Sequence, residues 1–328
     1  MSVRLSLALE EGTLVLPERG KVFVDAPPTN FDLSTLNPEK VTIRHRFRPD
    51  FDVWSHRAFE VSSESPTEAA AAIVVLSRAK EQNRARIAEA ATISDGYVIV
   101  DGAKTDGVDS LLKEIRKRCD VLGTVNKAHG KLFWFEADAA QFGDWRSKPR
   151  QIGDFVTLPG VFSADGMDPA SEMLLAMLPR NLGQRVADFG AGWGFLSARV
   201  LNDNPEIENI YLIEADHTSI DCAKQNVTDR RASFHWEDAR TWTPPERVST
   251  VIMNPPFHVS RAADPSLGQA FITNAARALS QNGSLWLVAN RHLPYEACLT
   301  SLFREVSEVG GDRRFKVLHA HRPKQIRT

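Results

Sequence analysis

The second half of the chain alternates short runs of apolar and β-branched residues with longer segments in which apolar residues recur every three or four positions. The short runs are typical of buried strands, and the longer periodic segments are typical of amphipathic helices. We expect strands over Arg185–Phe189, Asn209–Glu214, Ser233–Trp236, Thr250–Met253 and Ser284–Ala289. We expect helices over Trp193–Leu201, Thr218–Val227, Ser266–Leu279 and Pro294–Phe303.

Two further strands follow the last of these helices. The segments Glu305–Val309 and Phe315–Ala320 flank Gly310–Gly311–Asp312, which is typical of a hairpin turn. Strands that alternate with helices form βαβ units around a parallel sheet. We therefore predict an α/β domain with a seven-stranded, mostly parallel sheet of the Rossmann-like type.

The first half of the chain has a weaker pattern of the same kind. Its strand candidates are Lys21–Asp25, Val41–Arg44, Tyr97–Asp101 and Lys131–Glu136. Its helix candidates are Thr67–Ala79, which follows the capping sequence Ser65–Glu68, and Val108–Arg118. A polar, proline-containing link over residues 142–153 separates the halves. We predict two tandem α/β domains, residues 1–150 and 151–328.

Length and composition agree with a two-domain globular protein. The 328 residues are about twice the usual domain length of roughly 150, with 42% hydrophobic and 25% charged residues. The longest apolar run, Ala69–Leu76, is too short to cross a bilayer, and the N-terminus does not resemble a signal peptide. Three cysteines without CxxC spacing indicate neither a disulfide framework nor a metal site. We expect a cytoplasmic protein with no metal and no membrane partner.

The charges are nearly balanced, at 40 basic against 42 acidic residues, so any nucleic-acid contact has to come from local patches. One basic excess occurs at the C-terminus, where six Lys or Arg residues and two histidines follow Asp312 without an acid. This segment suits a phosphate backbone, and it equally suits a solvated tail.

A glycine-rich loop follows the first strand of the second half. Asp188 is followed by Gly190, Gly192 and Gly194, at every second position before a predicted helix. Glycine lets the backbone bend sharply and lets a ligand approach closely. Phe195 stands where a dinucleotide fingerprint has its third glycine, which disfavours NAD and FAD. The spacing resembles instead motif I of the class I S-adenosylmethionine-dependent methyltransferases.

Acidic residues end the next two strands, at the sheet edge where ligands bind. Glu214 lies about twenty residues after the glycines and is our candidate for the ribose hydroxyls. Asp238, followed by Ala239, is our candidate for the adenine amino group. We expect Trp193 and Trp236 to be packing residues.

The fourth strand ends in Asn254–Pro255–Pro256–Phe257–His258. The two prolines remove backbone donors and leave the Asn254 amide oxygen and the Pro255 carbonyl as acceptors. Such acceptors can bind the N–H groups of an exocyclic amine and stabilise the positive charge that grows on its nitrogen during methyl transfer. We expect Phe257 to stack on the base. His258 either shapes the target pocket or simply packs, and the sequence leaves both readings open.

Together these motifs resemble the bacterial ribosomal RNA guanine-N2 methyltransferases of the RsmC/RlmG type. Besides the motifs above, the resemblance rests on these segments: Leu158–Ser163, Asp165–Asp168, Val288–Asn290, Leu293–Tyr295 and Arg314–Val317. It implies two tandem methyltransferase-like domains, the first of which has lost its cofactor site. Consistent with that loss, Ala26–Pro27–Pro28 follows the first strand in place of a glycine loop.

The resemblance also implies a reaction and a set of site residues. It implies transfer of a methyl group from S-adenosylmethionine to the N2 amine of a guanine, most simply in small-subunit ribosomal RNA. Asn254, Pro255 and Phe257 are the expected catalytic residues. The expected cofactor-binding residues are Phe162, Asp188, Gly190, Gly192, Gly194, Glu214, Asp238, Ala239 and Asn254. The first domain would support the second and help dock RNA. Its candidate phosphate contacts, which equally suit a solvated face, are Arg44, Arg46, Arg48 and Arg57.

Three other functions remain open from the sequence alone. The target amine can belong to a guanine of large-subunit ribosomal RNA, or to a glutamine side chain of a protein that is methylated at N5. The third alternative is a ribosome-assembly factor that binds the cofactor without catalysis. The sequence does not indicate an oligomeric state.

Overall fold

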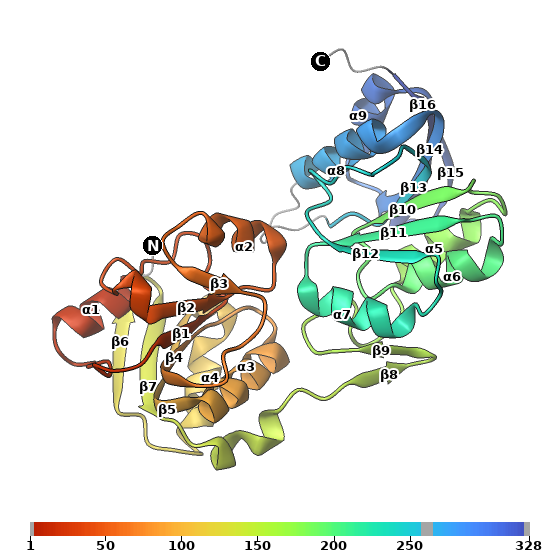
Figure 1. The fold of residues 1–328 in the computed structure, drawn as a ribbon. Helices are drawn as coiled ribbons and strands as arrows, with labels where there is room; N and C mark the ends of the chain where they lie inside the picture. The colour runs from red at the N-terminus through yellow and green to blue at the C-terminus, as the bar shows by residue number, and fades with distance from the viewer. Residues whose placement is uncertain (1–2, 257–264, 325–328) are drawn as a thin grey trace. The chain divides into compact units, whose positions relative to one another are not determined.

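The chain forms two compact units, Met1–Lys148 and Pro149–Thr328, in a computed structural model (Figure 1). The structure describes residues 3–256 and 265–324. Each unit contains one seven-stranded sheet, and a two-stranded sheet belongs to the second unit.

The first unit has a sheet whose strand order is β3-β2-β1-β4-β5-β7-β6. Its strands are β1 (Val22–Asp25), β2 (Val41–Arg44), β3 (Glu60–Ser62), β4 (Ala69–Val75), β5 (Ser94–Ala103), β6 (Gly123–Lys127) and β7 (Gly130–Glu136). Its α-helices are α1 (Arg4–Glu10), α2 (Arg48–Ser55), α3 (Lys80–Ile93) and α4 (Val108–Ile115). Short 3-10 helices are η1 (Pro38–Lys40), η2 (Lys104–Asp106) and η3 (Ala139–Trp145).

The second unit has the same strand order, β12-β11-β10-β13-β14-β16-β15. Its strands are β8 (Arg150–Ile152), β9 (Phe155–Thr157), β10 (Arg185–Phe189), β11 (Asn209–Glu214), β12 (Ala232–Trp236), β13 (Val248–Met253), β14 (Leu279–Asn290), β15 (Phe303–Gly311) and β16 (Phe315–Pro323). Its helices are α5 (Pro169–Met177), α6 (Phe195–Asp203), α7 (His217–Asn226), α8 (Pro265–Ala278) and α9 (Tyr295–Leu302).

Each large sheet has five parallel strands and closes with an antiparallel pair. In the second unit β14 pairs antiparallel with β16, and β16 pairs antiparallel with β15. The predicted fold, two tandem Rossmann-like sheets of which the second has seven strands, is confirmed, and so is the closing hairpin.

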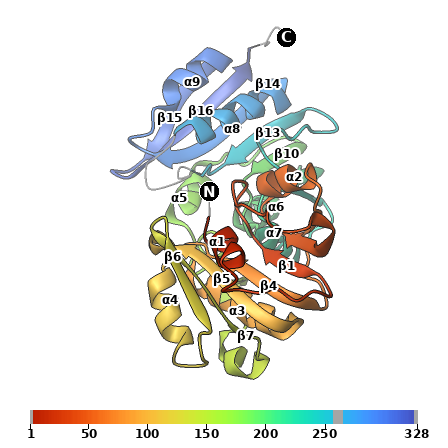
Figure 2. The ribbon, with the colours of Figure 1, turned by 90° about the vertical axis from the view of Figure 1, so that its left-hand side faces the viewer.

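Helices cover both faces of the second sheet, as two views of the ribbon show (Figure 1 and Figure 2). Leu174 of α5, Val200 of α6 and Cys222 of α7 are fully buried in one core, whereas Ile272 of α8 and Leu299 of α9 belong to the other. Because both faces are covered, the central strands β10 and β13 are buried along nearly their whole length. Because β10 and β13 are parallel, their carboxyl ends lie at the same edge of the sheet.

One predicted element of the first unit is wrong. The segment Thr67–Ala79 was expected to be a helix, and it contains the central strand β4 (Ala69–Val75). Four successive alanines favour a helix by intrinsic propensity, but a short continuous apolar run also fits a strand that is covered on both faces. Here β4 lies between β1 and β5, and its burial decides the outcome. The helix of this region is α3, which begins at Lys80.

The polar link contains more structure than its composition indicated. The 3-10 helix η3 is followed by the hairpin of β8 and β9. The side chain of Asn226, at the end of α7, accepts a hydrogen bond from the backbone N–H of Val156 in β9 and donates to the carbonyl oxygens of Val156 and Trp193. This one side chain therefore ties the hairpin to the glycine-rich loop.

Candidate active site

The glycine-rich loop after β10 adopts backbone angles that favour glycine. Gly190, Gly192 and Gly194 have φ values of 75°, 56° and 89°. A Cβ atom at Gly192 would meet nothing within 4 Å, whereas one at Gly194 would lie 2.8 Å from Val227. Gly192 therefore borders open space where a ligand can approach the backbone, and Gly194 allows α6 and α7 to pack closely.

Asp188 is a buried acid with one unused oxygen. The Ser197 hydroxyl donates to its Oδ2 at 2.7 Å, and Oδ1 has no hydrogen-bond partner among the described residues. Burial raises the pKa of Asp188 to about 7, and the charge of Glu214 adds to this effect. A buried acceptor without a donor is costly, and it suits a cationic amino group such as that of S-adenosylmethionine.

Glu214 connects the end of β11 to the glycine-rich loop. Its Oε2 accepts the backbone N–H of Gly192 at 2.9 Å, and its Oε1 accepts that of Asp216 at 2.8 Å. Burial raises the pKa of Glu214 to about 7, with the neighbouring charge of Asp216 contributing. The backbone N–H of Ala215 also donates to this carboxylate. A carboxylate has about four acceptor positions, so these three donors leave acceptor capacity for a ribose hydroxyl. The residues at this edge thus fit the cofactor that the sequence implied.

Asp238 lies two residues beyond β12 and is held by a neighbour. Arg240 pairs with its carboxylate at 2.5 Å, and the Arg240 backbone N–H also donates to it. Ala239 is buried, and its carbonyl oxygen accepts a hydrogen bond from the Asn274 side chain of α8 at 2.8 Å. The segment is therefore fixed from two sides, and the contact of Asp238 and Ala239 with adenine stays a prediction.

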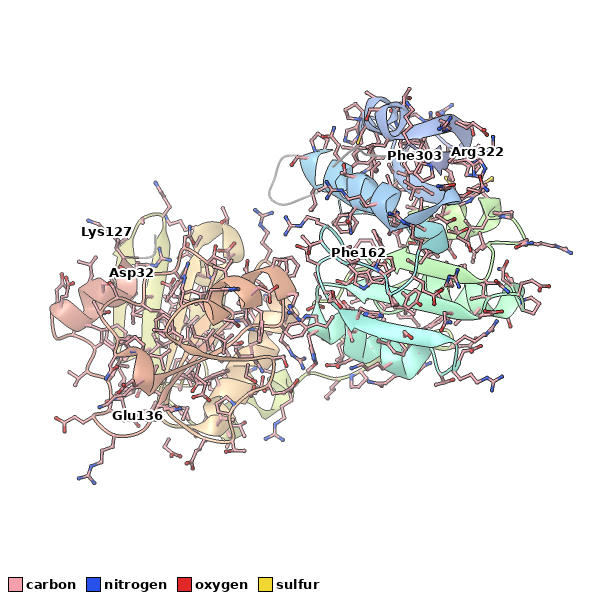
Figure 3. All side chains as sticks on the ribbon, turned by 45° about the horizontal axis from the view of Figure 1, so that its top comes forward. Asp32, Lys127, Glu136, Phe162, Phe303 and Arg322 are labelled. Atoms are coloured by element: carbon pink, nitrogen blue, oxygen red, sulfur yellow. The ribbon has the colours of Figure 1, made fainter. Side chains whose placement is uncertain are left out.

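Phe162 precedes α5 and is unusually exposed for an aromatic residue, at 57% of its surface (Figure 3). Its carbonyl oxygen accepts a hydrogen bond from the Trp193 indole N–H at 2.9 Å, which joins this segment to the glycine-rich loop. Trp193 itself is buried against Phe155, with ring centroids 5.2 Å apart. The packing role expected for Trp193 is confirmed, and the exposed ring of Phe162 is free to cover a ligand at this edge.

Asn254 follows β13 at the same sheet edge. Its side-chain Nδ2 donates to Asp168 Oδ2 at 2.8 Å and lies 3.0 Å from the Ser171 hydroxyl. Pro255 is buried and Pro256 is exposed. Neither partner was predicted as a site residue, although Asp168 ends one of the segments that carry the resemblance and stands before Pro169 as a helix cap does; Asp168 does cap α5. Phe257 and His258 lie outside the described residues.

In the first unit, the corresponding sheet edge is filled by charged side chains. Asp25 ends β1, and its carboxylate pairs with Arg44 at 2.8 Å and with Arg86 at 2.5 Å. Burial alone would raise the pKa of Asp25, but the two guanidinium groups hold it far below its usual range. Arg44 also pairs with Glu89 and is only 7% exposed. The proposal that Arg44 contacts RNA phosphates is therefore wrong, because its guanidinium is enclosed within the unit.

The other candidate phosphate contacts of the first unit also have partners inside the chain. Arg46 pairs with Glu64, Arg48 pairs with Asp52, and Arg57 donates to the backbone and lies over Trp54. These three side chains are nearer the surface than Arg44, and their contact with RNA stays a prediction.

The basic C-terminal segment is partly neutralised by acids on neighbouring elements. Lys316 is buried and pairs with Glu296, and Arg322 on the surface of β16 pairs with Glu305 (Figure 3). Contact of this C-terminal segment with RNA likewise stays a prediction.

Within residues 3–256 and 265–324, no group of three or more His, Cys, Asp or Glu side chains is arranged to hold a metal ion. No helix in these same ranges is long and apolar enough to cross a membrane.

Comparison with protein families and known proteins extends these observations. The family model of the methyltransferase small domain matches residues 153–319. A ribosomal RNA small subunit methyltransferase C from Hahella chejuensis is 34% identical over 243 residues, which cover 69% of each protein. A ribosomal RNA large subunit methyltransferase G from Pseudomonas putida is 34% identical over 174 residues, or 52% of this chain and 46% of that protein.

One solved structure resembles both units together. It is a 16S rRNA N2 G1207 methyltransferase (RsmC) of T. thermophilus in complex with AdoMet and guanosine. The TM-score is 0.78, the identity is 22%, and the match covers 94% of this chain and 90% of that one. At this identity the likeness concerns the fold, and it supports the tandem arrangement. The match to the family model over residues 153–319 shows that the chain belongs to the methyltransferase small domain family.

Proposed function

We propose that this protein transfers a methyl group from S-adenosylmethionine to the N2 amine of a guanine in small-subunit ribosomal RNA. The observation that carries the proposal is the convergence of three groups at one sheet edge. An open glycine-rich loop, two acids (the buried Asp188 and the partly buried Glu214) and the Asn254 amide lie at the carboxyl ends of the adjacent strands β10, β11 and β13.

The cofactor assignment is supported by the donors and acceptors of this edge. Asp188 Oδ1 offers a buried acceptor for a cationic amino group, and Glu214 offers acceptor capacity for a ribose hydroxyl. Asp238 would accept from the adenine amino group, and Phe162 would cover the ligand. When bound, S-adenosylmethionine supplies an electrophilic methyl group on a positively charged sulfur.

Asn254 and Pro255 would act on the acceptor amine. The exocyclic nitrogen of guanine is a weak nucleophile because its lone pair is delocalised into the ring. Hydrogen bonds from its two N–H groups to Asn254 Oδ1 and the Pro255 carbonyl would turn the lone pair toward the methyl carbon. They would also stabilise the positive charge that grows on nitrogen before a proton leaves to water. Orientation of two bound reactants lowers a barrier by roughly 7–11 kcal/mol, so no metal is needed.

Ribosomal RNA as the substrate is supported by the relatives. The match to the small-subunit enzyme of Hahella chejuensis spans 243 residues, whereas two matches to large-subunit enzymes span 174 and 204 residues. The longer match supports the small subunit as the source of the substrate, and the experiment below tests both subunits. We place the protein in the cytoplasm, where ribosomes are assembled, and we assign the first unit to RNA docking and support without a cofactor. The buried Asp25–Arg44 pair in that unit favours this division.

Methyl transfer to defined substrates tests the proposal. Purified protein is incubated with methyl-labelled S-adenosylmethionine and with small subunits, large subunits or ribosome-free extract from a strain that lacks this gene. We expect label in N2-methylguanosine from small subunits. Label in large subunits alone would keep the chemistry and overturn the substrate. Label in protein would support glutamine methylation, and absence of label from all three substrates would support a non-catalytic assembly factor.

A further inference from the structure

The Asn254 side chain is held by two residues of a distant segment. Its Nδ2 lies 2.8 Å from Asp168 Oδ2 and 3.0 Å from Ser171 Oγ, and both partners belong to the start of α5. The sequence separation is 86 residues to Asp168 and 83 residues to Ser171. The amide is therefore positioned by tertiary contacts in addition to the turn that follows β13.

The chemistry of the partner fixes which way the amide faces. An ionised carboxylate only accepts hydrogen bonds, so the amide nitrogen of Asn254 has to face Asp168. The Ser171 hydroxyl accepts the second N–H, which uses both donors of the nitrogen. On the planar amide group, the oxygen Oδ1 then points away from α5. With the amide reversed, two acceptor oxygens would face each other at 2.8 Å.

Asp168 and its neighbour Ser171 are themselves well anchored. Asp168 Oδ2 accepts the backbone N–H of Ser171 at 2.8 Å and caps α5. Ser171 is 8% exposed, and α5 packs through the fully buried Leu174 into one core of the second unit. The two residues that contact Asn254 are therefore held in place by the cap of α5 and by the packing of this helix into the core.

We infer that Asp168 and Ser171 are positioning residues for methyl transfer: they hold the Asn254 amide so that Oδ1 faces the acceptor amine. This inference rests on the proposed role of Asn254. It adds that the catalytic geometry depends on α5, an element outside the motif that follows β13. Misplacing Oδ1 removes the acceptor for the target amine and so lowers turnover, whereas Asp188 and Glu214, which are proposed to hold the cofactor, keep their own contacts.

The choice of substitutions separates positioning from helix capping. Asp168→Ser keeps a capping oxygen for α5, but its shorter side chain does not reach Asn254. Asp168→Asn keeps an acceptor oxygen at the length of the native side chain and serves as the rescue variant. Asp165→Ser is the matched control, because Asp165 lies in the same segment, its side chain is 85% exposed, and its ion pair is with Arg150 of β8 and not with Asn254.

The measurements are kcat with small subunits, the Kd for S-adenosylmethionine by calorimetry, and thermal stability. We expect Asp168→Ser to lower kcat about 10- to 100-fold with a Kd within about 2-fold of the native value. Asp168→Asn and Asp165→Ser should stay within about 3-fold of the native kcat, and Ser171→Ala should lie between the extremes. A native kcat for Asp168→Ser would overturn the inference.

A double-mutant comparison distinguishes this inference from the proposed function. If Asp168 acts through Asn254, adding Asp168→Ser to Asn254→Ala lowers kcat no further. An equal additional loss in that background would mean a purely structural role and would overturn the inference. Low activity of Asn254→Ala together with native activity of Asp168→Ser would reject the positioning role of Asp168 and leave the proposed role of Asn254 intact. Full activity of Asn254→Ala rejects the proposed role of Asn254 itself, and the inference falls with it.

Discussion

The carboxylate of Glu214 accepts a hydrogen bond from the backbone N–H of Gly192 at 2.9 Å, so the end of β11 supports the loop that follows β10. Both Glu214 and the neighbouring Asp188 have pKa values raised to about 7, chiefly because they are buried. The two acids at this edge are thus poised to change protonation near neutral pH when a cationic ligand binds.

Cofactor affinity should therefore increase with pH. The positive charge and the hydroxyl donors of the ligand favour the ionised forms of Asp188 and Glu214. At a pH where these carboxyls are protonated in the free protein, binding of the ligand therefore releases protons. We expect the Kd for S-adenosylmethionine to fall several-fold from about pH 6 to about pH 7.5. Calorimetry in buffers of different ionisation enthalpy measures the released protons. Glu214→Gln should bind more weakly and release fewer protons, and a pH-independent Kd in the native protein would refute this expectation.

The same two acids should make the ligand-free protein less stable as pH rises. Their folded pKa values of about 7 exceed the ordinary values of about 4, so the folded state binds more protons between these limits. The free energy of unfolding that they contribute falls as pH rises through this window. Asp188→Asn removes one such group. We expect urea denaturation to show this variant gaining stability, relative to the native protein, between pH 5 and pH 7; a constant difference would contradict the assignment.

Two glycines of the loop should respond differently to alanine. Gly192→Ala adds a methyl group where nothing lies within 4 Å, so the stability cost is limited to roughly 1–2 kcal/mol from its φ of 56°. The new methyl group would enter the open space that we assign to the cofactor, so we expect cofactor affinity to drop at least 10-fold. Gly194→Ala should cost more stability, because its Cβ would lie 2.8 Å from Val227. Thermal unfolding and calorimetry on both variants check this contrast, which equal losses of stability would contradict.

The buried ion pair of the first unit should be important for that unit's stability. Arg44→Ala leaves Asp25 buried with Arg86 as its remaining partner, and breaking a buried pair costs roughly 3–5 kcal/mol. Arg46→Ala, two residues later, removes a partly exposed pair with Glu64 and should cost only about 1 kcal/mol or less. Urea denaturation compares the two variants. As pH falls below the unfolded pKa of Asp25, about 4, the contribution of the pair should begin to decline, and it is lost only as pH falls further through the lowered folded pKa. Equal stability of both variants at neutral pH would contradict this account.

Local patterns in the sequence predicted the seven-stranded sheet of the second unit and its helices α6 to α9, but they did not predict α5 or the hairpin of β8 and β9. Its strands carry near-continuous apolar runs, and the glycines and Asn254 lie at strand ends, so parallel pairing brings them to one edge. The segment Thr67–Ala79 was ambiguous for a physical reason. Its alanine-rich run suits a helix or a buried strand, and only the pairing of β4 with β1 and β5 decides.

Contacts between side chains that are far apart in the sequence could not be predicted from the spacing of motifs. Arg44 was expected at the surface because it lies among other arginines, but Asp25 and Glu89 enclose it within the first unit. The contact of Asn254 with Asp168 likewise depends on where α5 packs, which no local pattern specifies. Residue type and strand position therefore indicated the chemistry, and tertiary packing determines which atoms are available for it.

Nucleoside analysis of ribosomal RNA from living cells tests the central claim most directly. Small-subunit RNA is compared by mass spectrometry between a strain lacking this gene and the same strain carrying the native gene or the Asn254→Ala variant. We predict that N2-methylguanosine at one position disappears with the gene, returns with the native gene and stays absent with Asn254→Ala. An unchanged set of N2-methylguanosines in the strain without the gene would contradict the account.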